Sequence, residues 1–557
     1  MTHHPTRRRG PFAVLVALGL VLPLGVARGT PGTPPPSDDL FEVGRAVYER
    51  GVLPDGTSLR GTQSTGTVLE GPLAACTACH RRSGFGTFEG PVMVPPITGS
   101  VLALPGPHHI APGRTPTGAA ATVPWYRALT RPAYDDTSLA RALREGLDPD
   151  GDPLMPPMPR YDLDGDALAG VLTYLRRLST APSPGVAPDA LRLATVVTPD
   201  AQPGADAAVL GVLRGWARQQ PGGLRWKLAE WRLSGPAEGW EAQLNERYRE
   251  QPVFALLSGV GGAEWLPVHR FCERTEVACV LPSVDVAPER PGDDWSVYFA
   301  PGVTLEARVL ARHLDTAATR AERRLRQVYG DAVGKRAAAA FAASLGPSVG
   351  PVSAHRFRHI APLAGLADMT DADTLILWLR PAEVAELVAR WPQGPTAGQV
   401  FLSALLAPSA ELSLPPAWKA RTGYVSLFDD WSPQGRSARV WLQAWLTRAG
   451  LPSDGVLRRQ ADAYGAAYAF TAALSRLQRL QLRWRGTTVT RAGLLEQLEA
   501  VVSKNVGNPV DLTSAVPHYR RLSLAAGQRM AARGGIVLRY AAPDAALLVP
   551  IAEDTAP

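Results

Sequence analysis

The sequence predicts an all-α domain at the N-terminal end, followed by an α/β region of two similar lobes. Apolar residues between positions 41 and 179 recur at helical spacing, whereas from position 191 onward short apolar runs alternate with helical patterns. A chain of 557 residues can bury several hydrophobic cores. With 45% hydrophobic and 20% charged residues, the composition is typical of soluble globular proteins and excludes a disordered chain or a multi-span membrane protein.

The charge balance does not point to a nucleic acid. Arg7, Arg8, Arg9 and Arg28 contribute to the formal net charge of +7, and they lie in a segment that we expect to be removed. The other arginines are spread evenly, without a basic stripe that is interleaved with aromatic residues. We therefore expect no nucleic-acid partner.

The first residues are organised like a secretory signal. The charged residues Arg7–Arg9 precede an apolar stretch at 11–26, and Ala27-Arg28-Gly29 provides small residues for cleavage. The apolar stretch is shorter than the roughly 20 residues that span a bilayer, so an uncleaved membrane anchor is the less favoured alternative. We expect a signal peptide at 1–29, a flexible N-terminus at 30–40 and a periplasmic location.

Cys76-Thr77-Ala78-Cys79-His80 is the motif that carries chemistry. Its spacing lets both thiols form thioethers with the vinyl groups of a haem and places the imidazole of His80 under the iron. A zinc site would need a second pair of ligands, and a thioredoxin-like dithiol would need a surrounding βαβ pattern. The sequence shows neither context, so we predict one covalent haem c held by Cys76 and Cys79, with His80 as an iron ligand.

A second iron ligand should come from a later loop of the same domain. Met158 lies in a proline-stiffened loop between two helical patterns and offers a soft thioether. Met155 is the alternative. Met93, His108 and His109 are further candidates, although a solvated loop explains the two histidines better.

Two helical patterns bracket the motif. Their apolar positions are Phe41, Gly44, Val47 and Tyr48 after a cap at Asp38 or Asp39, and Leu168, Val171, Leu172 and Leu175 after Asp164. With the motif between them, residues 41–179 resemble a class I cytochrome c. The resemblance implies a crossing of the first and last helices at Gly44 and Tyr174. It also implies that a carbonyl beside Pro95 orients the imidazole of His80, and that Met158 completes the coordination of the iron.

A six-coordinate haem favours one-electron transfer over oxygen or peroxide chemistry. We therefore expect an electron-transfer protein and not an enzyme. Its redox partner would be a periplasmic dehydrogenase or a respiratory carrier.

A proline-rich linker at 180–190 separates this domain from a second module at 191–557. The repeated βαβ pattern of the second module predicts parallel sheets with helices on both faces. The expected strands are 193–197, 226–230, 253–258, 278–282, 324–329, 374–379 and 399–403. The expected helices between them are 207–219, 241–248, 263–272, 333–345 and 383–391.

The order of these elements, with the phrases at 253–262, 281–285, 462–468 and 535–539, resembles the type I periplasmic solute-binding proteins of the branched-chain amino-acid-binding kind. The resemblance implies two α/β lobes, joined by three crossovers, that close over a small-molecule solute. The residues that it places in the cleft are Ser258, Gly259, Gly261, Ser283 and Asp285 on one lobe and Trp378, Arg380 and Ser403 on the other. Tight turns after buried strands explain the serines and glycines equally well.

Three further features qualify this prediction. Val333-Gly334 stands where many relatives have a tyrosine before the glycine, which argues against an amino-acid ligand. Gly259-Val260-Gly261 imitates a dinucleotide fingerprint, but Glu264 occupies the position of its third glycine. In an exported protein Cys272 and Cys279 are expected to form a disulfide, with two buried thiols as the alternative.

Two functions from different classes follow from the sequence. The first is electron transfer by a monohaem cytochrome whose second module senses a solute or docks a partner. The second is capture or sensing of a small solute, with the haem domain as an accessory.

Overall fold

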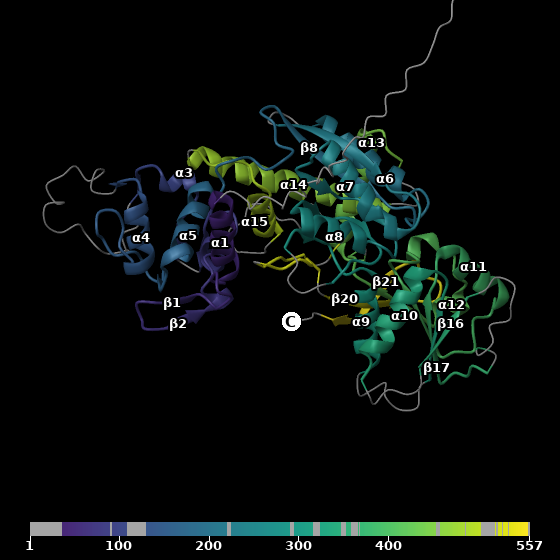
Figure 1. Ribbon diagram of the computed structural model, residues 1–557. Helices are drawn as coiled ribbons and strands as arrows, with labels where there is room; N and C mark the ends of the chain where they lie inside the picture. Colours follow the sequence, from purple (N-terminus) through teal and green to yellow (C-terminus); the bar gives the residue numbers. More distant parts are fainter. Residues whose placement is uncertain are drawn as a thin grey trace, which may run out of the picture.

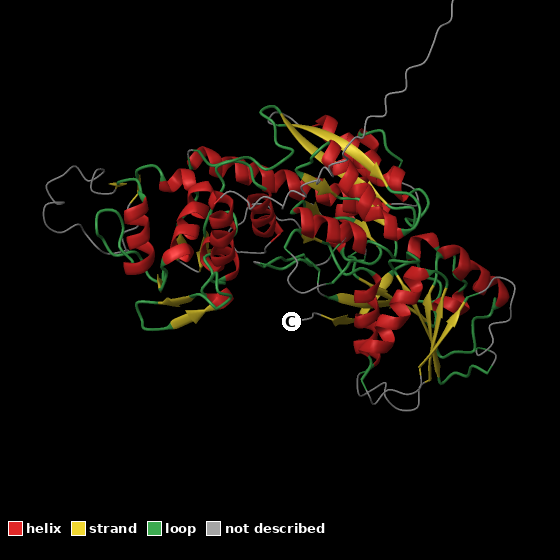
Figure 2. Ribbon diagram, viewed as in Figure 1, coloured by secondary structure: helices red, strands yellow, loops and turns green. Residues whose placement is uncertain are grey.

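In the computed structural model, two regions differ in architecture and meet at the long helices in the middle of the molecule (Figure 1). Figure 2 shows helices dominating the N-terminal region and layered sheets and helices in the rest. The structure describes residues 36–554 except 90–91, 108–129, 220–223, 290–293, 316–323, 347–351, 358–365, 367, 430, 453–456, 485, 503–518, 520–521, 526 and 533. The expected signal peptide at 1–29 and the candidate ligands His108 and His109 lie outside the described residues.

The N-terminal domain is built around two crossing helices, α1 (Pro36–Arg50) and α5 (Gly165–Arg177). They meet at Gly44 and Gly170, where a Cβ on Gly44 would lie 2.0 Å from the carbonyl oxygen of Gly170. The predicted crossing at Gly44 and Tyr174 is therefore confirmed. Gly170 on α5 is the residue that faces Gly44 most closely. Helix α1 begins before the predicted caps, so Asp38 and Asp39 lie in its first turn. Acidic side chains there still complement the helix dipole.

The remaining elements of this domain are short. The helices are α2 (Thr77–His80), α3 (Gly99–Leu102) and α4 (Asp136–Glu145). The strands are β1 (Arg60–Thr62), β2 (Val68–Glu70), β3 (Thr87–Glu89), β4 (Val92–Val94), β5 (Gly106–Pro107), β6 (Thr130–Arg131) and β7 (Arg160–Tyr161). The domain is mainly helical, but these strands are an addition to the all-α prediction. They include a small sheet in the order β2-β1-β7 and the pairs β3-β4 and β5-β6.

The first lobe of the second module holds a sheet in the order β13-β11-β8-β10-β12-β14, with β9 also paired to β8. The strand pairs in the described part of this sheet are parallel, as the βαβ pattern predicts. The strands are β8 (Ala190–Val197), β9 (Arg225–Arg232), β10 (Ala255–Leu257), β11 (Val260–Gly261), β12 (Ala278–Val280), β13 (Ser283–Val284) and β14 (Ser296–Val297). The helices of this lobe are α6 (Ala205–Gln219), α7 (Trp240–Glu250), α8 (Leu266–Thr275), α13 (Pro433–Arg448), α14 (Leu457–Arg483) and α15 (Arg491–Val502).

The second lobe holds a sheet in the order β16-β15-β17-β18-β19-β20-β21. Pairing is parallel as far as β19 and antiparallel from β19 to β21. The strands are β15 (Arg324–Tyr329), β16 (Val352–Arg356), β17 (Asp373–Trp378), β18 (Gln399–Ser403), β19 (Thr422–Ser426), β20 (Gly535–Tyr540) and β21 (Leu548–Asp554). The helices are α9 (Val303–Leu314), α10 (Ala332–Ser344), α11 (Pro381–Arg390) and α12 (Pro416–Lys419).

The chain passes between the two lobes three times. It leaves the first lobe after β14, returns after β19 to form α13 to α15, and enters the second lobe again at β20. Two of these passages lie side by side, because Tyr298 forms a bridge with Met530 and the amide of Ala532 donates to the carbonyl of Phe299 at 2.7 Å. The expected two-lobed architecture with three crossovers is thus present. Among the described helices, none combines the length and the apolar composition that a membrane crossing requires.

Candidate functional site

An apolar pocket in the N-terminal domain collects the residues that the motif analysis singled out. Cys76, Cys79 and His80 line it from the region of α2, while Met155 and Met158 line it from the loop before β7. These two segments are about 75 residues apart in sequence, so the fold brings the two expected groups of ligands to one cavity.

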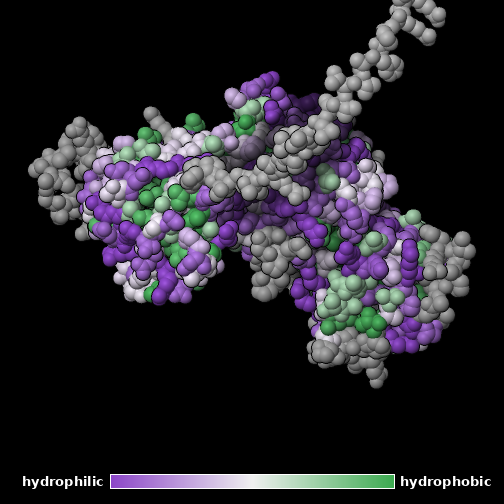
Figure 3. Space-filling view, viewed as in Figure 1, coloured by the Kyte–Doolittle hydropathy of each residue, from purple (hydrophilic) through white to green (hydrophobic). Residues whose placement is uncertain are grey.

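The rest of the pocket wall is mostly hydrophobic. It includes Leu69, Leu73, Ala75, Val94, Pro95, Pro96, Ile97, Leu102, Leu139, Leu143, Leu154, Tyr161 and Leu175, together with Met93. Arg131 is the one arginine among the described residues of this wall, and it is itself buried. In the space-filling view, apolar surface interrupts the hydrophilic surface of this domain (Figure 3). A mostly apolar ligand suits such a wall.

The imidazole of His80 is oriented by the backbone. Its Nδ1 lies 3.0 Å from the carbonyl oxygen of Pro95, which can only accept, so Nδ1 carries the proton. The lone pair of the ring is then on Nε2, the form in which histidine binds a metal. The sequence analysis expected this role for a carbonyl beside Pro95, and the geometry agrees.

The methionine loop is fixed from two sides. The side-chain amide of Gln63 donates to the carbonyl of Pro157 at 3.2 Å, and β1 pairs with β7 directly after the loop. Met158 also packs against the core that α1 and α5 share. Both Met155 and Met158 line the pocket, and the choice between them as iron ligand stays a prediction.

No disulfide joins the two cysteines of the motif, and Cys76 is buried. Burial raises the pKa of the Cys76 thiol to about 12. A redox-active dithiol needs surroundings that stabilise a thiolate, and these surroundings do the opposite.

The second candidate site is the boundary between the two lobes, where Asp285 is fully buried. Its carboxylate accepts from Arg380 of the second lobe at 3.0 Å, and from Arg458 at 2.9 Å and Arg459 at 2.7 Å at the start of α14. The three guanidinium groups hold the pKa of Asp285 well below its usual value, against the opposing effect of burial. The sequence analysis named Asp285 and Arg380 but missed Arg458 and Arg459.

Among the residues that the structure describes, two buried donors of this cluster have no hydrogen-bond partner, Nη1 of Arg380 and Nε of Arg459. Ser283 is satisfied, because its hydroxyl donates to Asp462 at 2.5 Å. Buried donors and acceptors normally find partners, so these atoms are candidates for contact with a ligand or with water.

Other residues placed in the cleft by the resemblance have packing roles. Gly259 and Gly261 are required by Trp265, whose ring lies 2.9 Å and 2.7 Å from where their Cβ atoms would be. Trp378 is buried and donates to Gln327 at 2.7 Å. The hydroxyl of Ser403 donates to Glu306, a buried carboxyl whose pKa is raised by burial to about 8. The turn and packing explanation therefore accounts for the two glycines.

Cys272 and Cys279 are buried thiols that neighbour each other across α8 and β12. Burial and the adjacent Cys279 raise the pKa of Cys272 well above its usual value. The sequence expectation of a disulfide between them remains a prediction.

A scan against protein-family models and a search of curated proteins both find no match. Solved structures are similar to the second module. A fatty acid ABC transporter substrate-binding protein from Thermomonospora curvata has 15% identity and a TM-score of 0.47, covering 67% of this chain and 93% of its own. A branched-chain amino acid ABC transporter protein from Thermus thermophilus with bound valine has 12% identity and a TM-score of 0.47, covering 66% and 96%.

A leucine-binding protein from Thermotoga maritima has 12% identity and a TM-score of 0.45, covering 65% of this chain and 98% of its own. The description of the two lobes rests on the strand order and the crossovers, independently of these superpositions.

Proposed function

We propose that the N-terminal domain carries one covalently attached haem c and transfers single electrons. The observation that supports this most directly is the pocket itself, which gathers Cys76, Cys79, His80 and Met158 in an apolar wall. The first and last helices cross tightly beside it, as in the cytochromes that this region resembles.

Each residue has a distinct task in this proposal. Cys76 and Cys79 would hold the haem through thioether bonds, and His80 would bind the iron through Nε2, with its ring fixed by the Pro95 carbonyl. Met158 would supply a second protein ligand to the iron, and the chemistry that a bound haem would supply is reversible one-electron transfer. The charge of Arg131 in the pocket wall would offset the propionates.

With a haem bound, the apolar walls would lower the polarity around the iron and would favour its less charged, reduced form. Export through a signal peptide would place the chain in the periplasm, where a dehydrogenase or a respiratory carrier would be its redox partner.

The assignment of the methionine ligand is tested by comparing Met158→Ala with Met155→Ala in the full chain. In the reduced protein, a methionine bound to haem iron gives a strongly upfield-shifted methyl resonance. We expect Met158→Ala to lose this signal and Met155→Ala to keep it. Retention of the signal in both variants would rule out the proposed ligation.

A second function is supported by the charge cluster between the lobes. We propose that the second module binds a small solute there, because buried donors on Arg380 and Arg459 have no partner among the described residues. A shift of the melting temperature with amino acids, fatty acids or dicarboxylates tests this, with Arg380→Ala as the cleft variant and Arg214→Ala as a surface control. Absence of any shift across these three classes would contradict solute binding of this kind.

A further inference from the structure

The segment that directly follows the haem-attachment motif is embedded in the second module. Phe85 is buried in the large core of that module, and Gly493 on α15 leaves room for its ring. The amide of Ser83 donates to the carboxyl of Glu496 at 2.8 Å, and the Ser83 hydroxyl donates to the same carboxyl. Residues 81–85 are therefore held jointly by the two modules.

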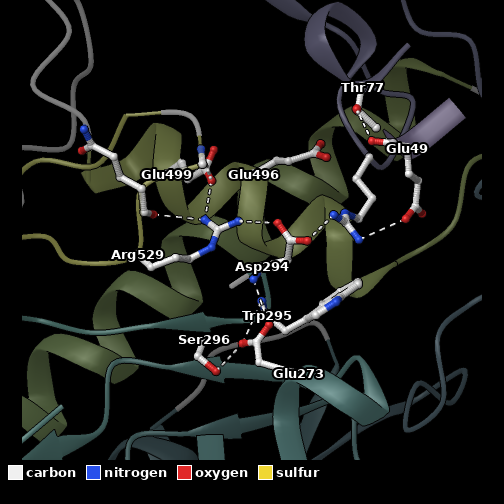
Figure 4. A network of polar contacts seen from close by, with 12 residues as sticks. Glu49, Thr77, Glu273, Asp294, Trp295, Ser296, Glu496, Glu499 and Arg529 are labelled. Atoms are coloured by element: carbon white, nitrogen blue, oxygen red, sulfur yellow. Dashed lines mark hydrogen bonds and ion pairs between the residues drawn. The ribbon is translucent and has the colours of Figure 1, made fainter. Parts of the chain in front are cut away.

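Two carboxylates connect this segment to one further arginine. Glu499 on α15 accepts from Arg81 with one oxygen and from Arg529 with the other, the latter at 2.7 Å. Asp294 likewise faces Arg82 at 2.5 Å with one oxygen and Arg529 at 4.0 Å with the other. Figure 4 shows Arg529 lying between Glu499 and Asp294. Each carboxylate thus bridges Arg529 to an arginine that lies within two residues of His80.

Arg529 stands at the hinge between the lobes. Its carbonyl accepts from the amide of Tyr298 at 2.8 Å, and the amide of Ala531 donates to Tyr298 at 3.0 Å. These contacts join two of the three passages that connect the lobes, and Asp294 lies just before one of them. A change in the angle between the lobes must bend these passages, and Arg529 would move with them.

The backbone at Arg81, directly after His80, has a strained conformation. Arg81 has a φ of 68°, a conformation that favours glycine, and its carbonyl accepts from the hydroxyl of Tyr48 at 2.8 Å. The side chain of this arginine forms an ion pair with Glu499.

We propose that the position of the two lobes and the haem site are coupled through Arg529, Glu499 and Asp294. Arg380 on the second lobe binds Asp285 on the first, so the lobes are held together in this structure. Opening them would withdraw Arg529 from the two carboxylates, which would then bind Arg81 and Arg82 more strongly. Solute binding would thereby change the reduction equilibrium of the haem, and reduction would change solute affinity by the same factor. The coupling rests on the proposed haem function.

The test uses hydrogen exchange of the full chain and needs no ligand. Arg529→Ala should slow exchange severalfold in the peptide that contains residues 81–86 beside His80, because Glu499 and Asp294 then bind Arg81 and Arg82 more strongly. It should accelerate exchange severalfold in the peptide that contains residues 283–286 in the cleft. Arg380→Ala removes the contact between the lobes and should change the exchange of both peptides in the same directions as Arg529→Ala. The matched control is Arg539→Ala, an exposed arginine on β20, which should change neither peptide. A response at only one of the two peptides, or at neither, would overturn the coupling.

A second readout uses the haem-loaded protein. Arg529→Ala should shift the reduction equilibrium at least fivefold, about 40 mV at 59 mV per tenfold for a one-electron couple. An unchanged potential in a coloured protein refutes the coupling alone. A colourless protein refutes the haem assignment. The exchange experiment then still decides whether residues 81–86 and the cleft between the lobes are coupled.

Discussion

Replacement of Gly44 by alanine gives the sharpest test of the helix crossing beside the pocket. The new Cβ would lie 2.0 Å from the carbonyl oxygen of Gly170, whereas ordinary contact begins at 3.4 Å. The helices would have to separate by about 1.4 Å, because both clashing groups are fixed by backbone. The separation would also loosen the ring contacts of Tyr174 with Phe41 and Tyr48, whose centroids lie at 5.1 and 4.9 Å.

Overpacking of a core costs about 1–3 kcal/mol where side chains can adjust, and a backbone clash should reach the upper end. A loss of about 3 kcal/mol corresponds to roughly a hundredfold faster hydrogen exchange through local opening. Exchange of peptides from α1 and α5 measures it. Gly239→Ala is the control, because its Cβ would meet only the side chain of Gln243 at 3.9 Å. Unchanged exchange in Gly44→Ala would show that the crossing is looser than described.

Three further predictions concern the second module and its interface. Burial raises the pKa of Glu496 from its usual 4.5 to about 7, so the folded state holds a proton there that the unfolded state releases. The free energy of unfolding should fall by about 3 kcal/mol as the pH rises from 4.5 to 7. Urea unfolding at pH 5 and pH 8 measures this decrease, and Glu496→Gln should remove the contribution of Glu496 to it. Asp285→Asn should lower the free energy of unfolding by about 3 kcal/mol, because it leaves buried guanidinium groups without their shared carboxylate. A decrease below about 1 kcal/mol in urea unfolding would contradict this. Mass spectrometry of protein from the periplasm should show Cys272 and Cys279 joined as a disulfide, whereas alkylation of both thiols would contradict it.

The sequence was informative wherever the signal is local. Spacing within residues 76–80 defines the attachment motif without any fold. The expected strands at 324–329 and 399–403 coincide with β15 and β18, because each is a short apolar run bounded by breakers. The glycine of a helix crossing was also found, since Gly44 interrupts an otherwise apolar helix face.

Long-range electrostatics could not be predicted in this way. Asp285 is neutralised by Arg458 and Arg459, which lie more than 170 residues later in the chain. Nothing in the immediate sequence of Asp285 shows which arginines will reach it. The resemblance instead favoured residues at strand ends, where Gly259 proves to be explained by packing against Trp265.

The contact between the two modules also could not be predicted, because its residues lie far apart in the sequence. Residues 81–85 look like a simple extension of the motif, and Phe85 carries no sequence mark of belonging to a different core. Two of the carboxylates that hold this segment, Glu496 and Glu499, come from α15, more than 400 residues away. Only the folded chain brings them together.

The central claim is that the pocket beside His80 is built for a covalently bound haem. Intact mass and the absorption spectrum of its pyridine derivative, measured on protein exported from a host with a c-type maturation system, test it most directly. We predict one haem per chain that resists acid extraction and is lost from the Cys76→Ala, Cys79→Ala double variant. A colourless wild-type protein with both thiols open to alkylation would contradict the account.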